Sequence, residues 1–496
     1  MHHHTDLIVS TARGAVRGMR QNGTAAFLNI PYAAPPRGAD RFAPPRPHAP
    51  WDGVRDATTP GPTSPQSARK LGGIDMSPYY GAGWSRGEDF LTVDVRTPVA
   101  GGAGLPVMVF VHGGAFVAGS TRSALYDGSA FARDGVVLVT LNYRLGIAGF
   151  LDLPGAPANR GLLDVVAALR WVQDNITAFG GDPHNVTVFG QSAGATLVGA
   201  VLADPGAAGL VRRAIVQSGS GLGAFTTEQA ARVTRAAARA LDIAPHVDAF
   251  AGLSDERLVE AASGLAGLDL RTATHHDPLL GLSPFSLVLD TQPAASVAAG
   301  PSADVDLLIG TNTEEGNLYL VPVGTYATST AADVHEVAAR SHPDPARLVE
   351  TYRGSRPEAS HAELRSAVMA DALFGAGSRA LADAHAAHPS SATYAYEFAW
   401  RSQALGGELG ATHTVELPFV FDLADLPGLS GPTGLLGPDK PPADFATRVH
   451  ETWIRFARTG DPGWAPYDTG RRATMRIDAE WTQVDDPRGP ERAAWS

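Results

Sequence analysis

Five consecutive residues place a serine where nucleophilic chemistry is possible. Gly190-Gln191-Ser192-Ala193-Gly194 follows a short apolar run at 186–189 and precedes an apolar stretch at 195–198. A strand that turns sharply into a helix would leave Ser192 at the apex, with its Oγ exposed at the positive end of the helix dipole. Glycines at 190 and 194 lack the Cβ atoms that would collide with neighbouring elements. A five-residue pattern of this kind often occurs by chance. The interpretation of Ser192 as a nucleophile therefore depends on the flanking elements.

A second small-residue loop lies upstream and could bind the negative charge that nucleophilic attack creates. The β-branched run 107–111 leads directly into His112-Gly113-Gly114-Ala115-Phe116. The N–H groups of this loop, together with that of Ala193, would form an oxyanion hole. Taken alone, the loop would be interpreted as an ordinary glycine-rich turn, but its position after a strand favours the functional interpretation. For His112 we expect a structural hydrogen bond at the turn rather than the role of base.

The base and its orienting acid cannot be chosen from residue chemistry alone, because the chain holds 16 histidines and 51 acidic residues. The chain order serine, acid, histidine restricts both to positions after 192. His413 stands out there because it follows the small residues 410–412. The other histidines in this part are His246, His275, His276, His335, His342, His361, His385, His388 and His450. The acid is expected in the loop after a strand end at 307–310, where the local pattern does not separate Glu314 from Glu315.

The sequence around these residues predicts a mostly parallel sheet with helices on both faces, which is the α/β class. Continuous apolar runs at 107–111 and 136–141 suit strands buried on both faces. Apolar residues at helical spacing predict a helix over 162–179, and Asp182-Pro183 is expected to break the chain before the strand at 186–189. Further helices are expected near 227–243, 378–388 and 446–459, and the proline-rich stretch 31–66 is expected to be coil.

Composition excludes several classes of function. The 39 basic and 51 acidic residues give a net charge of −12, which argues against a nucleic-acid partner. The chain has no cysteine, so disulfides and thiolate chemistry are excluded. No apolar run approaches the roughly 20 residues that cross a bilayer, and Met1-His2-His3-His4 has the character of a tag or a disordered end rather than a signal peptide. We expect a cytoplasmic protein without membrane association, with secretion through a trimmed leader as the alternative.

The motifs resemble those of the type-B carboxylesterases of the α/β-hydrolase superfamily, a family that includes bacterial para-nitrobenzyl esterases, animal carboxylesterases and cholinesterases. The resemblance covers nearly the whole chain, with many motifs in the family's order. They include Gly14-Ala15-Val16-Arg17-Gly18, Ile30-Pro31-Tyr32-Ala33-Ala34-Pro35-Pro36, Gly87-Glu88-Asp89-Phe90-Leu91, Asn142-Tyr143-Arg144-Leu145-Gly146, Phe179-Gly180-Gly181-Asp182-Pro183, Gln217-Ser218-Gly219 and Phe456-Ala457-Arg458-Thr459-Gly460-Asp461-Pro462.

This resemblance implies an α/β-hydrolase fold in one domain over residues 5–496, with helical insertions covering the active site. It also implies that Glu315 is the acid and His413 the base for Ser192, so that only the resemblance separates Glu315 from Glu314. The implied oxyanion donors are Gly114, Ala115 and Ala193, and the implied supporting residues are Gly113, Gln191 and Ser218, the last as a hydrogen-bond donor to the acid.

The function implied is hydrolysis of small-molecule carboxylic esters through an acyl-enzyme intermediate, without metal or cofactor, by a monomer or weak homodimer. Gln191 is neutral where cholinesterases carry a cation-attracting glutamate, so neutral esters of small to medium acids, including aryl esters, are expected. The alternatives are an amidase or lipase on the same scaffold, or a binding protein without activity. The expected pocket residues, for each of which core or surface packing is an equal alternative, are Trp84, Phe116, Phe225, Phe285 and Leu318.

Overall fold

The computed structural model describes residues 7–21, 23–81, 83–98, 100–101 and 104–496, so the expected terminal segment 1–4 lies outside the described residues. Within them, thirteen strands form one mixed sheet in the order β1-β2-β3-β5-β7-β6-β8-β9-β10-β11-β12-β13, with β4 paired to β2. The strands are β1 Leu7–Thr11, β2 Gly14–Gln21, β3 Thr24–Pro31, β4 Val54–Asp56, β5 Thr92–Thr97, β6 Leu105–Val111, β7 Val137–Leu141, β8 Gly181–Gln191, β9 Arg213–Gln217, β10 Asp306–Asn312, β11 Thr393–Phe398, β12 Ala473–Ile477 and β13 Thr482–Asp485.

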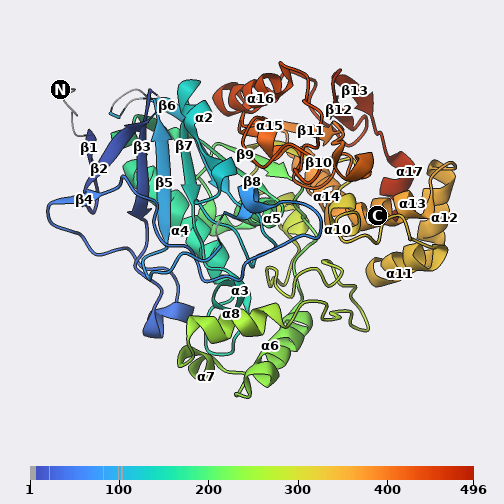
Figure 1. Ribbon diagram of the computed structural model, residues 1–496, viewed down its shortest axis with the longest axis horizontal. Coiled ribbons are helices and arrows are strands. Elements are labelled where there is room, and N and C mark those ends of the chain that lie inside the picture. Colours follow the sequence, from blue (N-terminus) through green and yellow to red (C-terminus); the bar gives the residue numbers. More distant parts are fainter. Residues whose placement is uncertain (1–6, 22, 82, 99, 102–103) are drawn as a thin grey trace.

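Helices surround this sheet, and Figure 1 shows α6 to α8 grouped at its lower end and α11 to α13 grouped at its side. The helices are α1 Ser77–Tyr80, α2 Ser129–Arg133, α3 Gly146–Phe150, α4 Arg160–Asn175, α5 Ala193–Ala203, α6 Thr227–Leu241, α7 Val247–Ala251, α8 Asp255–Ser263, α9 Pro293–Ala298, α10 Asn317–Leu320, α11 Ala331–Ser341, α12 Pro345–Ser355, α13 His361–Ala370, α14 Ala376–Ala386, α15 Leu417–Val420, α16 Phe445–Thr459 and α17 Gly489–Ala494. Among the described residues, none of these helices combines the length and apolarity needed to span a membrane.

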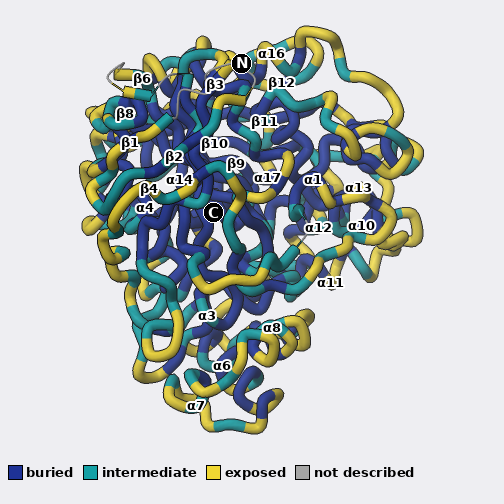
Figure 2. Tube along the Cα trace, turned by 60° about the vertical axis from the view of Figure 1, so that its left-hand side comes forward, coloured by how far each residue is buried: buried dark blue, intermediate teal, exposed yellow. Residues whose placement is uncertain are grey.

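The central strands are buried on both faces, as their unbroken apolar runs predict. Val107, Val109 and Val111 of β6 pack in the same apolar cluster as the inner face of α4. Met108 and Phe110, which alternate with them along the strand, belong to a second cluster with the inner face of α16. Buried residues accordingly run through the middle of the molecule in Figure 2, and exposed residues gather on outer segments such as α7. The prediction of an α/β chain with helices on both faces is confirmed.

Two expectations about the chain's course are wrong in detail. Strand β8 begins at Gly181 and runs through Asp182-Pro183, which we expected to break it. The register between β6 and β8 shifts here, with Leu105 opposite Gly181 but Val107 opposite Val186, so Pro183 lies in a bulge where no ladder donor is needed. The stretch 31–66 is mostly irregular as expected, but it carries a 3₁₀ turn at Gly38–Phe42 and strand β4.

The arrangement of strands brings the residues singled out in the sequence to one edge of the sheet. Strands β6, β8, β9, β10 and β11 are consecutive neighbours and pair in parallel. The carboxyl ends of parallel strands meet at the same edge, where ligands of open α/β sheets bind. The loop after β6, the serine after β8 and the acidic loop after β10 therefore leave the sheet side by side.

Candidate active site

Ser192 occupies a strained turn between β8 and α5. Its φ of 58° and ψ of −126° lie outside the regions that ordinary residues favour. The turn is held by hydrogen bonds from the Ser192 N–H to the Gln217 carbonyl (2.9 Å) and from the Thr196 N–H to the Ser192 carbonyl (2.9 Å). A Cβ built on Gly194 would lie 2.0 Å from the Val111 carbonyl oxygen, so only glycine fits there.

The loop after β6 presents free amide groups beside this serine. Gly114 has a φ of 113° and Ala115 a φ of 56°, so the loop folds back tightly enough for the Gly114 carbonyl to accept from the N–H groups of Val117 (3.1 Å) and Ala118 (3.0 Å). Within the described part of the chain, the N–H groups of Gly114, Ala115 and Ala193 have no acceptor. Unpartnered amides are rare in folded proteins, and these three residues line one cavity with Ser192.

His413 and Glu315 form a buried hydrogen-bonded pair at the same cavity. The Glu315 Oε2 atom lies 2.5 Å from His413 Nδ1. The other carboxylate oxygen, Oε1, accepts hydrogen bonds from the Ser218 hydroxyl (2.5 Å) and from the Asn312 N–H (2.7 Å). These three contacts fix the carboxylate, which in turn orients the imidazole so that Nε2 is left for other partners.

The free edge and the face of the imidazole have further neighbours. The Nε2 atom lies 3.3 Å from the side-chain nitrogen of Gln191. The Phe374 ring stacks on His413 with centroids 4.3 Å apart and planes 10° apart. Phe374 belongs to a π-helical turn at Asp371–Gly375, and such turns are frequent at functional sites. The ring of His413 is therefore fixed on one edge by an acid and on one face by an aromatic ring.

The structure separates Glu314 from Glu315 by their partners. Glu314 accepts a hydrogen bond from the Ala411 N–H (2.9 Å) and pairs with Arg401, so it braces the loop that carries His413.

His112 behaves as expected of a structural residue, since its Nδ1 lies 2.8 Å from the Gly113 carbonyl and its ring stacks on Tyr143. Burial lowers the pKa of His112 to about 4. Of the ten histidines after residue 192, only His413 lines the cavity among the described residues.

The cavity at the serine has a volume of about 240 Å³ and a largely apolar wall. Its lining includes Phe116 and Leu318, two of the five residues expected there. Helical segments between β10 and β11 supply Leu318, Tyr319 and Phe374, consistent with helical insertions that cover the site. The apolar lining consists of Leu71, Met76, Tyr79, Tyr80, Phe116, Tyr126, Leu279, Leu282, Leu318, Tyr319, Val323, Leu373 and Phe374.

Three residues expected in the pocket lie elsewhere. Phe225 is 2% exposed, and its N–H donates to the Leu287 carbonyl (2.7 Å), which places it in the core. Phe285 is buried in the same apolar cluster. The Trp84 ring is covered by the guanidinium of Arg86, 3.6 Å from the ring centroid. None of the three lines the cavity. For these residues the structure therefore favours the alternative given in the sequence analysis, which is core or surface packing.

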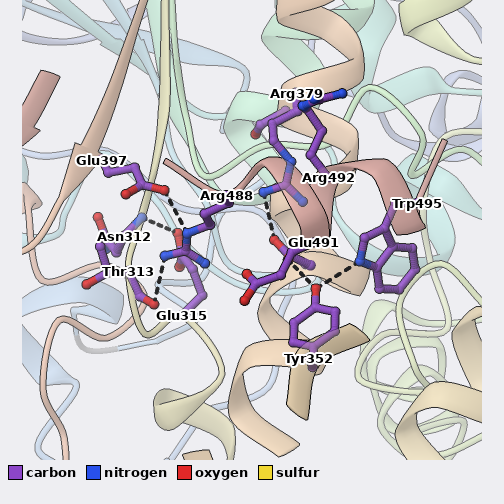
Figure 3. Close-up of polar contacts among 12 residues, drawn as sticks. Asn312, Thr313, Glu315, Tyr352, Arg379, Glu397, Arg488, Glu491, Arg492 and Trp495 are labelled. Atoms are coloured by element: carbon purple, nitrogen blue, oxygen red, sulfur yellow. Dashed lines mark hydrogen bonds and ion pairs between the residues drawn. The ribbon is translucent and has the colours of Figure 1, made fainter. Parts of the chain in front are cut away.

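Sequence reasoning missed a contact between the end of the chain and the loop of Glu315. Arg488, just before α17, pairs with Glu397 (Nε to Oε1, 2.7 Å) and donates from Nη2 to the Thr313 carbonyl (3.3 Å). Figure 3 shows Arg488 lying between Glu397 and the segment from Asn312 to Glu315. No motif marks this residue, because its partners are distant in sequence and come together only in the fold.

A second buried carboxylate, Glu416, also escaped the sequence analysis. It accepts hydrogen bonds from the side chains of Asn312 (2.7 Å) and Gln217 (3.3 Å), and Asn312 also donates to the Thr412 carbonyl (2.7 Å). Glu416 thus ties the strand ends beneath the site to the loop of His413. Burial, and secondarily the nearby charge of Glu315, raise the pKa of Glu416 to about 7.

This raised pKa predicts a pH-dependent stability. Below the ordinary value of 4.5 both states hold the Glu416 proton, whereas between 4.5 and about 7 the folded protein holds it and the unfolded chain does not. The free energy of unfolding therefore falls as the pH rises through this window. We expect Glu416→Gln to abolish about 3 kcal/mol of that decline. Urea unfolding at several pH values measures it, with the exposed Glu336→Gln as control; equal slopes in all three proteins would contradict the prediction.

The elbow serine, the free amides and the histidine–glutamate pair at the carboxyl edge of a mostly parallel sheet define a protein of the α/β-hydrolase fold. Residues 5–495 match the model of the carboxylesterase family, and the chain belongs to that family. It is 36% identical to para-nitrobenzyl esterase of Bacillus subtilis (strain 168), with 98% of each chain covered. It is 35% identical to phenmedipham hydrolase of Pseudarthrobacter oxydans, with 96% of each covered.

Solved structures agree with this assignment. A carboxylesterase from Geobacillus stearothermophilus superposes with a TM-score of 0.85 at 34% identity, covering 99% of this chain and all of the other. A PNB esterase structure gives a TM-score of 0.83 at 35% identity, covering 99% of this chain and 100% of its own. The protein is therefore a carboxylic-ester hydrolase.

Proposed function

We propose that this carboxylesterase hydrolyses neutral carboxylic esters through a triad of Ser192, His413 and Glu315. The observation that carries the proposal is the buried His413–Glu315 pair, with Nδ1 2.5 Å from Oε2, at the cavity that Ser192 lines. This arrangement has the parts of a nucleophile, a base and an orienting acid. No other histidine after residue 192 lines that cavity among the described residues.

The reaction proceeds in two halves. His413 takes the proton of Ser192 as the hydroxyl attacks the ester carbonyl, and it then protonates the departing alcohol. Water activated by the same imidazole releases the acid from the acyl-enzyme. Glu315 keeps the Nδ1 proton in place and stabilises the imidazolium. Its own position is set by the Ser218 hydroxyl and the Asn312 N–H.

The oxyanion of the tetrahedral intermediate accepts hydrogen bonds from Gly114, Ala115 and Ala193. Their amides are free in the described part of the chain and line the cavity of Ser192. Ala115 holds a left-handed φ of 56°, which costs a non-glycine residue about 1 kcal/mol. The loop keeps this conformation in advance of substrate, so no reorganisation is needed when charge develops.

Apolar esters of small to medium acids fit the cavity best. Its wall is mostly aromatic and aliphatic, and its volume of about 240 Å³ suits a compact ligand. Para-nitrobenzyl and para-nitrophenyl esters are the first substrates to test, since a relative at 36% identity carries the name para-nitrobenzyl esterase. An amidase or a lipase on this scaffold would differ in the bond cleaved or the physical state of the substrate.

Covalent labelling and a comparison of acyl bonds test the proposed function together. An aryl organophosphonate should react with one serine, identified as Ser192 by peptide mass spectrometry. An aryl ester should be cleaved at least about a hundredfold faster, in kcat/KM, than the matching anilide or an emulsified triglyceride. Labelling at another serine, or preference for the anilide or the triglyceride, would contradict the proposal.

The neutral Gln191 predicts a weak response to cationic alcohols. It lies against His413 and lines the cavity, where a carboxylate would attract a quaternary ammonium group. Gln191→Glu should therefore raise kcat/KM for a choline ester, relative to its uncharged carbon analogue, by roughly tenfold, about 1.4 kcal/mol. Kinetics with this substrate pair in wild type and variant provide the measurement. A wild type that already prefers the cation tenfold would contradict the interpretation of Gln191.

A further inference from the structure

Two cationic side chains, Arg69 and Lys70, line the cavity of Ser192. Within the described part of the chain, no aspartate or glutamate lines it. This is unusual for a chain with 51 acidic and 39 basic residues, in which Lys70 is one of only two lysines. Besides His413, the basic or acidic side chains of the described residues that a bound substrate meets in this cavity are therefore Arg69 and Lys70, both of which carry positive charge.

Within the residues that the structure describes, neither cation is neutralised by a carboxylate. Arg69 donates from Nη1 to the Gly114 carbonyl at 3.5 Å, a long hydrogen bond that holds the guanidinium beside the oxyanion loop. Among the described residues, no ion pair joins Arg69 or Lys70 to an acidic side chain. Arg69 is half-buried and Lys70 is exposed, so the guanidinium of Arg69 is partly shielded from water.

The same two residues also line a neighbouring cavity of about 230 Å³. That cavity contains Asp255, but this carboxylate already pairs with Arg41 at 3.3 Å. Arg69 and Lys70 therefore line both cavities. Within the described residues, a carboxylate carried on a substrate would find there two cations without an acidic partner, and no competing acid in the cavity of Ser192.

Resting on the proposed function, we propose that Arg69 and Lys70 form a carboxylate subsite through which the enzyme, besides neutral esters, accepts esters carrying one additional anionic group. Such substrates include the half-esters of dicarboxylic acids, with the charge on the acyl side, and esters of hydroxy acids, with the charge on the alcohol side. The two residues determine specificity. They bind a part of the substrate remote from the ester bond, and they move no proton in the reaction.

The test compares matched charged and neutral substrates. The acyl-side pair is para-nitrophenyl hemiglutarate and its methyl-capped diester, and the alcohol-side pair is meta-carboxyphenyl acetate and meta-carbamoylphenyl acetate. In at least one pair, the ratio of kcat/KM for the anion to that for the neutral ester should fall about tenfold in R69M/K70M. Because each ratio is taken within one protein, a change in the chemistry common to both substrates cancels. R69K should retain most of the wild-type ratio.

A charge-matched control separates a local subsite from the field of the whole protein. R347M/K440M removes one exposed arginine and the other lysine outside both cavities, and it brings the net charge from −12 to −14, as R69M/K70M does. Its ratio should equal that of wild type. The wild-type ratio of kcat/KM for the anion to that for the neutral ester should also fall as salt shortens the Debye length from about 10 Å at 0.1 M to about 3 Å at 1 M.

Organophosphonate labelling of each protein distinguishes the two possible failures. If Ser192 is labelled and both ratios are unchanged in R69M/K70M, the subsite is wrong and the proposed function stands. If the two double variants lower the ratio equally, the effect comes from net charge and the subsite is again wrong. If wild type shows neither labelling nor ester cleavage, the proposed function fails and the subsite with it.

Discussion

Ser192→Ala is expected to lower kcat/KM for an aryl ester by about 10⁴- to 10⁶-fold while the protein stays folded. The substitution removes only an oxygen, and the strained turn is held by backbone hydrogen bonds, from the Ser192 N–H to Gln217 and from Thr196 to Ser192, that alanine preserves. Labelling by the organophosphonate should vanish with turnover. Circular dichroism and thermal unfolding establish that the fold is intact.

A serine in the same cavity offers the matched control for this experiment. Ser286 also lines the cavity, but its hydroxyl donates to the Gly223 carbonyl at 2.7 Å and is engaged in structure. Ser286→Ala should therefore change kcat/KM less than about tenfold. Near-wild-type turnover in Ser192→Ala would show that the nucleophile is another group.

His413→Ala should be nearly as damaging, again by about 10⁴-fold or more. The variant loses the proposed base, the hydrogen-bond partner of Glu315 and the ring that stacks on Phe374. Combined with Ser192→Ala, it should add little, because in the proposed mechanism the two groups act as one unit in proton transfer. Rates of the single and double variants on one aryl ester test this.

The exposed His335 provides the control, since it lies on α11 outside the cavity. His335→Ala should keep wild-type kinetics. Additive losses in the His413 and Ser192 variants would mean that the two residues act separately, which is incompatible with a shared mechanism.

Much of this architecture could be predicted because local pattern and burial agree. The run 107–111 is apolar at every position, which is typical of a strand covered on both faces. In the structure, alternate side chains of this strand belong to two different apolar clusters. The elbow at Ser192 was recognisable because glycine is required where the Val111 carbonyl approaches to 2.0 Å of a would-be Cβ on Gly194. A steric requirement of this kind can be recognised in the sequence, because only glycine satisfies it.

Other features of the site cannot be recognised from the sequence pattern. An aromatic residue such as Phe225 or Phe285 has the same composition signal in a pocket wall as in the core, and both are in the core. Phe374 and Glu416 reach the site through a π-helical turn and a buried hydrogen-bond network, neither of which has a sequence period. The local sequence does not distinguish Glu314 from Glu315 either, since they differ only in which partners the fold brings to them.

The contact of Arg488 with the Thr313 carbonyl has a consequence for how the enzyme comes into being. The loop that holds Glu315 obtains one of its supports from a residue that is translated after every strand of the sheet. While the ribosome still encloses Arg488, that loop lacks this support even if the sheet has already formed around it. We therefore expect nascent chains stalled before Arg488 has left the ribosome to be inactive toward substrate, and longer ones to gain esterase activity.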